Sequence, residues 1–309
     1  MDASDLIKAL QNTLQGGGRP HMGLGTDAMQ HTLGIAGSLG SGLMAAQEGA
    51  MVKRLHSGHA GQNGVYAALL ARRGFTGIPD VVEAPYGGFL SSLSRQPDLE
   101  RLTAGLGKVW ETLNVGFKMY PSVTSIHSAL DALQAIMRDH ALAAEEIASI
   151  HVGVGHMTHV HTAWPYKPAG ITAAQMNMFY GLSVMALHGS VSTADFVDDR
   201  VADPALLAFM ARITVEEDDG INALGRKARH GCRMVVTTQD GRRFRQDVDD
   251  RRGSPENPVD TAAIEAKFLT NAGTCLDGRS TSRVAELVSC MESSGIGELT
   301  EILGGALAE

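Results

Sequence analysis

The stretch Ile147-Ala-Ser-Ile-His-Val-Gly-Val154 decides the fold class, because its apolar residues alternate with other residues. A period of two is typical of a half-buried β-strand. Residues 212–216 and 233–238 also have strand character, and Gln239-Asp-Gly241 forms a turn signal that leads into residues 242–248. Together these segments predict a small sheet that contains a β-hairpin.

Helical patterns surround the predicted strands on both sides. Residues 24–48 combine helix formers with closely spaced small residues, which predicts two helices or one broken, deeply buried helix. Apolar residues at helical spacing predict further helices over residues 64–73, 97–113, 128–140, 171–187, 261–271 and 283–292. The chain is therefore predicted to have an α+β fold in which helices predominate.

Changes in these patterns predict four parts of the chain. They are an atypical N-terminal segment at 1–22, the first part of a helical domain at 23–115, an α+β domain at 116–258 and C-terminal helices at 259–309. The Gly- and Pro-containing segment 253–258 marks the last boundary. The C-terminal helices are predicted to return to the helical domain.

The composition is that of an ordinary globular protein. Apolar residues make up 44% of the 309 residues, charged residues make up 19%, and the mean hydropathy is -0.03. No apolar run approaches the ~20 residues that a membrane span needs, and the N-terminus lacks the pattern of a signal peptide. These features predict a cytoplasmic protein that does not bind membranes.

The net charge of -8 argues against a nucleic-acid partner, because binding to a phosphate backbone needs a dense basic face. Isolated basic pairs in an acidic protein suit small anions better. Such pairs occur at Lys53/Arg54, Arg72/Arg73 and Arg242/Arg243.

Neither the cysteines nor the glycine-rich segment predicts a redox or nucleotide site. Cys232, Cys275 and Cys290 are widely separated, so they support neither a disulfide framework nor a zinc knuckle, and we predict three buried thiols. Several glycines lie between residues 34 and 42, but no strand precedes them. We therefore predict no dinucleotide-binding loop there.

A cluster of histidines is the one pattern that favours a metal ion. His151, His156, His159 and His161 lie close in sequence, and the last two would share one face of a strand, a spacing able to chelate a metal. No cysteine or carboxylate stands nearby in the sequence to complete the ligand set. We predict surface histidines, with no metal and no cofactor.

Several short motifs follow one another in a recognisable order, and their combination is specific although each is weak alone. They are His31-Thr-Leu-Gly-Ile-Ala-Gly-Ser38, Met51-Val-Lys-Arg-Leu-His-Ser-Gly-His-Ala60, Gly74-Phe-Thr-Gly77, Gly87-Gly-Phe89, Lys118-Met-Tyr-Pro-Ser122 with His127, Ala129-Leu-Asp-Ala132, Tyr180 before Met185-Ala-Leu-His-Gly189, Asp240-Gly241 and Gly253-Ser-Pro-Glu-Asn-Pro258. From about Gly23 to its C-terminus the chain resembles the MmgE/PrpD family.

This resemblance implies both a fold and a chemistry. The family fold is a mainly helical domain with a smaller α+β domain inserted before the last helices. Members include 2-methylcitrate dehydratases, cis-aconitate decarboxylases and an iminodisuccinate epimerase, and they resemble homodimers. These enzymes make or break bonds beside carboxylates, where preorganised cations and hydrogen-bond donors stabilise the developing negative charge.

The resemblance therefore predicts a dehydratase-like lyase whose substrate is a small polycarboxylate such as 2-methylcitrate. One alternative is an epimerase or isomerase of a dicarboxylate in the same cleft. Another is a truncated, non-catalytic relative that binds a polycarboxylate or a partner subunit.

The resemblance also assigns roles to individual residues. Lys53 and Lys118 match active-site lysines, and Tyr180 matches an active-site tyrosine whose phenol can hydrogen-bond an anion or relay a proton. These three are the predicted catalytic residues. The predicted substrate-binding residues are Arg54, His56, Ser57, Ser122 and His127, of which Arg54 would grip a carboxylate through two N–H groups.

Each assignment has a structural alternative. Lys53 would be a surface lysine at a helix start, and Lys118 a solvated hinge lysine. His56 would fix the turn in which it is predicted to lie, together with the neighbouring serine. Tyr180 would be a core aromatic, and His127 would cap a helix or support the site indirectly.

Two departures from the family pattern bear on activity. Val123 stands where decarboxylase-type members can carry a histidine, which makes decarboxylation of cis-aconitate less favoured. Family members also carry a long upstream helical section that supplies acidic and histidine residues, whereas Met1 to Met22 contains Gln15-Gly-Gly-Gly-Arg-Pro20, which is typical of a flexible linker.

A general base must reach the proton that it removes, so the sequence supports binding of a polycarboxylate better than its turnover. Three explanations of the short upstream section stay open. The chain is truncated, a second polypeptide supplies the upstream section, or the chain is a degenerate binding protein.

Overall fold

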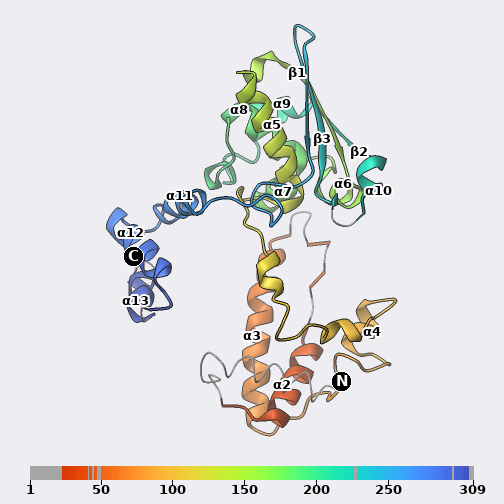
Figure 1. Ribbon diagram of the computed structural model, residues 1–309, viewed down its shortest axis with the longest axis vertical. Helices are drawn as coiled ribbons and strands as arrows, with labels where there is room; N and C mark the ends of the chain where they lie inside the picture. The colour runs from red at the N-terminus through yellow and green to blue at the C-terminus, as the bar shows by residue number, and fades with distance from the viewer. Residues whose placement is uncertain are drawn as a thin grey trace. The chain divides into compact units, whose positions relative to one another are not determined.

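The computed structural model describes residues 23–40, 42–43, 45–46, 50–225, 228–293 and 296–305. The chain forms two compact units, Met1–Leu113 and Asn114–Glu309, each of which is described by itself (Figure 1). The predicted N-terminal segment 1–22 lies outside the described residues, as do residues 41, 44, 47 and 48 of the predicted 24–48 helical region.

Helices α2 and α3 form the framework of the first unit. Its elements are α2 (Thr26–Ser38), α3 (Val52–Arg72), α4 (Phe89–Leu93) and the 3-10 turn η2 (Glu100–Leu102), and η3 (Glu111–Asn114) follows at the boundary. Ile35 of α2 packs with Ala67 and Ala71 of α3 in a small buried cluster. The two alanines let the helix backbones approach closely, because they have little side-chain volume.

Glycines bring α2 close to the chain at residues 77 and 78. A Cβ atom on Gly34 would lie 2.2 Å from the Ile78 carbonyl oxygen, and one on Gly77 would lie 2.4 Å from the His31 carbonyl oxygen. The Gly77 N–H donates to His31 Nδ1 at 3.3 Å. The His31–Ser38 and Gly74–Gly77 motifs therefore have a packing function in this unit.

The second unit contains a sheet and the helices that pack with it. Its elements are η4 (Thr124–Ile126), α5 (His127–Asp139), η5 (Ala144–Glu146), β1 (Ile147–Val154), α6 (His156–Thr162), α7 (Ile171–Met176), α8 (Met178–His188), η6 (Thr193–Asp195), α9 (Pro204–Met210), β2 (Ile213–Glu217), α10 (Asp219–Ala223), β3 (Cys232–Thr238), β4 (Arg243–Val248), α11 (Thr261–Ala272), α12 (Gly278–Ser289) and α13 (Gly297–Gly305).

The four strands pair in the order β2-β1-β3-β4. Strand β1 is parallel to β2 and antiparallel to β3, and β3 and β4 form the predicted antiparallel hairpin. Helix α5 packs against β3 and β4 and also contacts α8, on one face of the sheet (Figure 1). Leu130 and Leu133 of α5, Ile150 of β1 and Met185 of α8 are fully buried in the resulting core.

Strand β4 is one edge of the sheet and has two different faces. Arg243, Arg245 and Asp247 are exposed, whereas the intervening Phe244 and Val248 are half-buried. Arg245 Nη2 lies 2.9 Å from Asp247 Oδ2 on the exposed face. The alternation follows from the pleat of a strand, in which successive side chains point to opposite faces.

The predicted α+β fold class is confirmed, and the predicted strands agree with the structure to within one residue. Strand β1 has the predicted bounds, whereas β2 and β4 begin one residue later than predicted and β3 begins one residue earlier. The prediction of a strand at His159 and His161 is wrong, because both residues lie in helix α6. The strand pattern ends at Val154, and Gly155 precedes the helix.

Two predicted helices have different bounds. The helix predicted at 64–73 begins already at Val52, so the Met51–His59 stretch is helical and the turn predicted around His56 is wrong. Residues 97–113 form short 3-10 turns in place of the predicted helix. Gly105 and Gly107 have φ values of 72° and 76°, a left-handed conformation that interrupts an α-helix.

The helix predicted at 171–187 is divided into α7 and α8 by Asn177. This residue has extended backbone angles, φ -104° and ψ 129°, and its side chain accepts a hydrogen bond from the Tyr180 N–H at 3.1 Å. Asparagine is favoured at such N-cap positions because its side chain replaces a missing helical acceptor. Helix α2 was predicted to be deeply buried, but only Thr32, Gly34 and Ile35 of it are buried.

The prediction of three buried thiols is wrong for two of the cysteines. Cys232 is buried as predicted, whereas Cys275 and Cys290 are exposed near the ends of α11 and α12.

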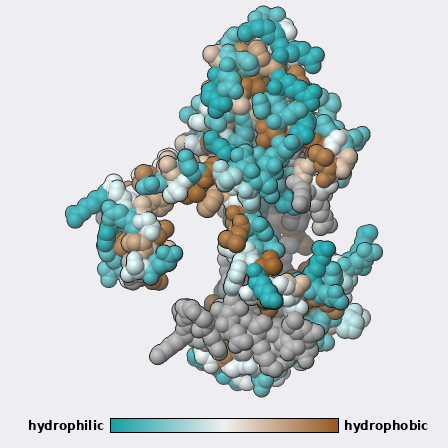
Figure 2. Space-filling view, in the orientation of Figure 1, coloured by the Kyte–Doolittle hydropathy of each residue, from teal (hydrophilic) through white to brown (hydrophobic). Residues whose placement is uncertain are grey.

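In the view of Figure 2, hydrophilic residues predominate on the visible face of the sheet-containing part, with apolar side chains between them. No helix among the described residues is both long and apolar enough to cross a membrane.

Candidate functional site

The backbone around Lys118 is held at several points. The Phe117 N–H donates to the Gly253 carbonyl oxygen at 2.6 Å, and Arg251 Nη1 donates to the Phe117 carbonyl oxygen at 2.8 Å. Lys267 Nζ of α11 donates to the Lys118 carbonyl oxygen. The Lys118 ammonium itself donates to the Ser122 carbonyl oxygen at 3.1 Å. The side chain of this predicted catalytic lysine thus has a defined position.

Lys118 lines a cavity of about 540 Å³ in the second unit. The cavity also receives the guanidinium-bearing side chains of Arg229 and Arg251, together with His230 and Val123. Three cationic side chains around one cavity attract a small anion, and an arginine can bind a carboxylate through two N–H groups. The cavity therefore contains side chains that can bind a carboxylate.

Carboxylates also line this cavity, and they equal its three cationic side chains in number. Asp249, Asp250 and Glu256 contribute to its wall. Asp249 Oδ1 lies 2.6 Å from Arg233 Nη2, so part of its charge is balanced by an arginine that does not line the cavity. The cations can bind the carboxylates of a hydroxy acid, and the carboxylates of the wall can accept a hydrogen bond from its hydroxyl group.

Ser122 and His127 lie beside the cavity but do not line it. Ser122 is 5% exposed and contributes its carbonyl oxygen to Lys118, whereas His127 is 0% exposed at the start of α5. The His127 ring meets the edge of Tyr120 at a centroid distance of 5.2 Å. Burial, followed by the positive charges of Arg251 and Lys118, lowers the pKa of His127 to about 3. His127 is therefore a neutral supporting side chain at pH 7.

His127 should make the stability of the folded chain depend on pH. Its folded pKa of about 3 lies below the ordinary value of 6.5, so the unfolded chain takes up a proton first as the pH falls. The free energy of unfolding should therefore drop by roughly 3 kcal/mol between pH 6.5 and pH 4 through this residue. His127→Gln should lack that part of the pH dependence in urea unfolding curves.

His140→Gln provides the control substitution, because His140 is an exposed histidine at the end of the same helix. Parallel pH curves for His127→Gln and the wild type would contradict the role of His127.

Tyr180 lies in the core of the second unit. Its side chain is 0% exposed, and its hydroxyl donates to the Asp195 carbonyl oxygen at 2.6 Å. The ring packs with Tyr166 and Phe196 at centroid distances of 5.3 Å and 5.6 Å. Burial raises the pKa of Tyr180 to about 12. Tyr180 does not line the Lys118 cavity, and its catalytic role stays a prediction.

Comparison with protein families decides what kind of protein carries this cavity. The family model described as the MmgE/PrpD C-terminal domain matches residues 120–293, and the MmgE/PrpD N-terminal domain matches residues 21–102. The chain belongs to the MmgE/PrpD family. The resemblance inferred from the motifs is therefore confirmed. The residues that line the cavity lie in the region assigned to the C-terminal domain, except Asn114 and Lys118, which come just before it.

Several curated relatives in this family have decarboxylase names. The chain is 29% identical to the cis-aconitate decarboxylase-like protein oryM of Aspergillus oryzae, over 93% of this chain and 62% of the relative. It is 28% identical to a cis-aconitate decarboxylase of Aspergillus terreus, over 91% and 59%, and 25% identical to that of Homo sapiens, over 92% and 59%. The chain thus spans 59% to 62% of the length of these relatives.

The other predicted site residues of this MmgE/PrpD chain lie in the first unit, in the first two turns of α3. His56 and Ser57 follow Lys53 by three and four positions, a spacing that places each of them next to Lys53 on the helix surface. Partial burial, followed by the charge of Arg54, lowers the pKa of Lys53. No acidic residue lies in the first turn, so the cations add to the positive end of the helix dipole.

His56 is packed differently from its neighbour Ser57. A Cβ atom on Gly42 would lie 3.3 Å from His56 Nδ1, so the ring is close to the Gly42 backbone, whereas Ser57 is exposed. The structure therefore groups Lys53, Arg54, His56 and Ser57 on α3, and groups Lys118 with Ser122 in the second unit.

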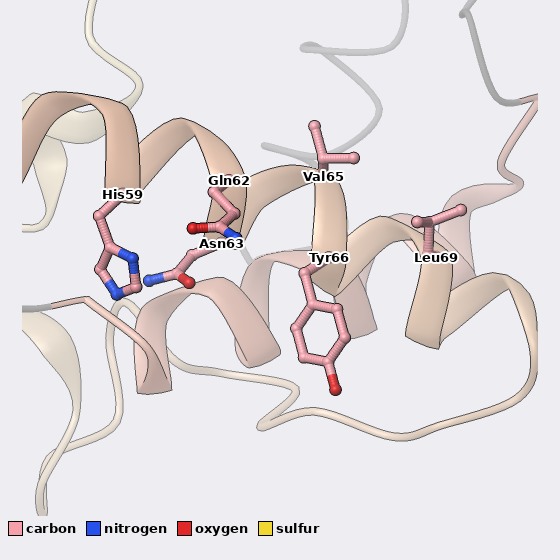
Figure 3. A pocket seen from close by; sticks show the side chains of 6 residues that line it. All are labelled: His59, Gln62, Asn63, Val65, Tyr66 and Leu69. Carbon is pink, nitrogen blue, oxygen red and sulfur yellow. The ribbon is translucent and has the colours of Figure 1, made fainter.

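A second cavity, of about 580 Å³, runs along α3 (Figure 3). Its wall consists of uncharged polar and apolar side chains with one imidazole, namely His59, Gln62, Asn63, Val65, Tyr66 and Leu69. In Figure 3, His59, Gln62 and Asn63 gather along one part of the helix, and Tyr66 projects from it further along. None of these lining residues is a lysine or arginine, which makes this cavity a poor match for a polycarboxylate.

Two histidines of the cluster contact the carboxylate of Glu217 in the structure. His156 Nδ1 lies 2.9 Å from Glu217 Oε1, and His159 Nδ1 lies 3.7 Å from the same oxygen. The sequence did not indicate this carboxylate, because Glu217 lies far from the histidines along the chain. Within the described residues, no group of three or more His, Cys, Asp or Glu side chains is arranged to hold a metal ion.

Arg251, Arg229 and His230 line the cavity but were not predicted as site residues from the sequence. Arg251 stands two positions before the Gly253–Pro258 motif, so its closeness to a family motif was a usable signal. Arg229 and His230 lie outside every motif, and only the fold brings them to the cavity. Arg229 Nε donates to His230 Nε2 at 3.0 Å, which assigns the proton of the neutral imidazole to Nδ1.

Proposed function

We propose that this chain provides the carboxylate-binding part of a lyase that acts on a small polycarboxylate. The observation that carries the proposal is the single cavity shared by Lys118, Arg229 and Arg251. Loss of water or carbon dioxide from such a substrate builds negative charge on a carbon beside a carboxylate. Fixed cations stabilise that charge more in the transition state than in the ground state, because it develops during the reaction.

We propose 2-methylcitrate as the first substrate to test and cis-aconitate as the second. Val123 lines the cavity at the position where decarboxylase-type members can carry a histidine. An aliphatic side chain cannot donate a proton to the substrate. This favours elimination of water. The names of the curated relatives favour decarboxylation of cis-aconitate, so both reactions belong in one assay.

In this proposal, Lys118 binds a substrate carboxylate or stabilises the developing carbanion. Lys53, with Arg54, His56 and Ser57, is proposed as an anion-binding group of the first unit, since partial burial and Arg54 already lower the pKa of Lys53. Ser122 and His127 are proposed to act through the position of Lys118. A homodimer in the cytoplasm stays the predicted state of the protein.

Replacement of Lys118 tests the proposal. The purified chain is mixed with 2-methylcitrate or cis-aconitate, and alkene absorbance and carbon dioxide release are recorded. Lys118→Met should lower kcat/KM about 100-fold, because removal of one preorganised donor typically has an effect of this order. Lys167→Met is the matched control, since this exposed lysine does not line the cavity. Unchanged turnover in Lys118→Met would refute the assignment.

Binding without turnover is the second candidate. Of the described side chains that line the cavity, His230 is the one imidazole, and its Nε2 lone pair is engaged by Arg229. Burial, followed by the charges of Arg229 and Arg251, lowers the pKa of His230 to about 4. A polycarboxylate that raises the Tm of the wild type but not of Lys118→Met, with no product formed, would identify this function. Solvent deuterium entering recovered substrate would identify an epimerase.

A further inference from the structure

Two of the chain segments that build the Lys118 cavity are bonded to one carboxylate. The segment before α5 contributes Lys118, and the segment after β4 contributes Arg251. Asp131 of α5 lies between them: Tyr120 Oη donates to Asp131 Oδ1 at 2.8 Å, and the Arg252 N–H donates to Asp131 Oδ2 at 2.8 Å. Each carboxylate oxygen thus fixes one of the two segments.

Burial makes these two hydrogen bonds important. It is the largest cause of the raised pKa of Asp131, and the hydrogen bonds from Arg252 and Tyr120 oppose that rise. Tyr120 is 4% exposed, so its hydroxyl has little access to water as a replacement partner. A buried donor or acceptor that loses its partner destabilises the arrangement that placed it there.

The two segments also touch each other directly at positions that only glycine fits. A Cβ atom on Gly116 would lie 2.5 Å from the Gly253 carbonyl oxygen, and one on Gly253 would lie 2.5 Å from the Phe117 carbonyl oxygen. These contacts hold the backbones together next to Lys118. Asp131 also bonds to both segments. Its partners are Tyr120, two positions after Lys118, and Arg252, one position after Arg251.

We infer that Asp131 is a positioning residue that sets the distance between the Lys118 ammonium and the Arg251 guanidinium, through its bonds to Tyr120 and Arg252. The choice of a polycarboxylate as its ligand rests on the proposed function. The positioning itself does not, because it is a property of the free protein. The Ala129–Ala132 and Gly253–Pro258 motifs thereby have one common role, which is to build the cavity.

The test replaces Asp131 by Asn, which keeps the shape but removes the charge and one acceptor. The first measurement is the rate at which acetic anhydride acetylates Lys118, followed by mass spectrometry over a range of pH. Lys118 should react about threefold faster in Asp131→Asn, because the segment that holds it is freed. The second measurement is the Kd of citrate by calorimetry, which should increase about tenfold because the cations are misplaced.

Asp139→Asn is the matched control, because Asp139 lies on the same helix but is exposed and pairs with Arg138 at 2.8 Å. It should leave both measurements unchanged. If Asp131→Asn does not fold, Tyr120→Phe removes the other hydrogen bond of the same carboxylate and should change both measurements in the same direction.

The outcomes separate the two proposals. Wild-type acetylation of Lys118 in a folded Asp131→Asn or Tyr120→Phe variant would overturn the positioning role, whatever citrate does. Faster acetylation with no citrate binding by the wild type would support the positioning role and count against the polycarboxylate ligand. Unchanged circular dichroism must accompany either result, so that global unfolding does not produce the effect.

Discussion

Gly253→Ala should destabilise the second unit by about 3 kcal/mol and weaken citrate binding at the Lys118 cavity. Gly253 has a φ of 86°, a left-handed conformation in which a side chain is strained. Its Cβ would also lie 2.5 Å from the Phe117 carbonyl oxygen, so the backbone next to Lys118 must shift. Urea unfolding measures the free energy of unfolding, and calorimetry measures the Kd of citrate.

Gly241→Ala is the matched control for this prediction. Gly241 has a φ of 87°, yet no described atom lies within 4 Å of its Cβ position. The control therefore contains the backbone strain without the steric overlap, and it lies in the β3–β4 turn. Equal destabilisation by the two substitutions, with equal citrate affinity, would show that the contact with Phe117 has no role.

Tyr180→Ala should lower the free energy of unfolding by about 4 kcal/mol, because it opens a large cavity in a closely packed core. Tyr180→Phe should lower it by only about 1 kcal/mol, through the lost hydrogen bond to the Asp195 carbonyl oxygen at 2.6 Å. On the structural alternative, folded Tyr180→Phe keeps wild-type turnover. On the catalytic prediction, it loses turnover and keeps most of its stability.

Tyr166→Phe provides the comparison, because Tyr166 also donates its hydroxyl to a backbone carbonyl, that of Val201, at 2.8 Å. It lies outside the motif that contains Tyr180. A similar small loss of stability in both phenylalanine variants, with equal turnover, would decide for packing. A selective loss of turnover in Tyr180→Phe would decide for catalysis.

Local periodicity was sufficient to predict the sheet. The alternation expected in Ile147–Val154 corresponds to alternating exposed and buried side chains over Ser149–Val152, and the Gln239–Gly241 turn fixes the hairpin. It was not sufficient for α7 and α8, since Asn177 stops a helix that its apolar neighbours would continue. The α3 start was missed because the first turns of this helix expose nearly all of their side chains, which leaves no apolar stripe to recognise.

The sequence predicted a cavity residue only where that residue belongs to a family motif. Lys118 lines the cavity, and its motif gave the position directly. Arg229 and His230 reach the same cavity from the chain between α10 and β3, and no sequence pattern signals that approach. Ser122 illustrates a third case, in which the predicted residue is involved through its backbone carbonyl and not through its hydroxyl.

The alternating surface of β4 bears on how this protein behaves at high concentration. An edge strand offers unpaired backbone groups to any other strand, and pairing between molecules begins fibril growth. Arg243, Arg245 and Asp247 are spaced along the exposed face of that edge. A second molecule that added a strand there would have to desolvate these charges. The exposed charges of β4 therefore disfavour strand pairing between two copies of this chain.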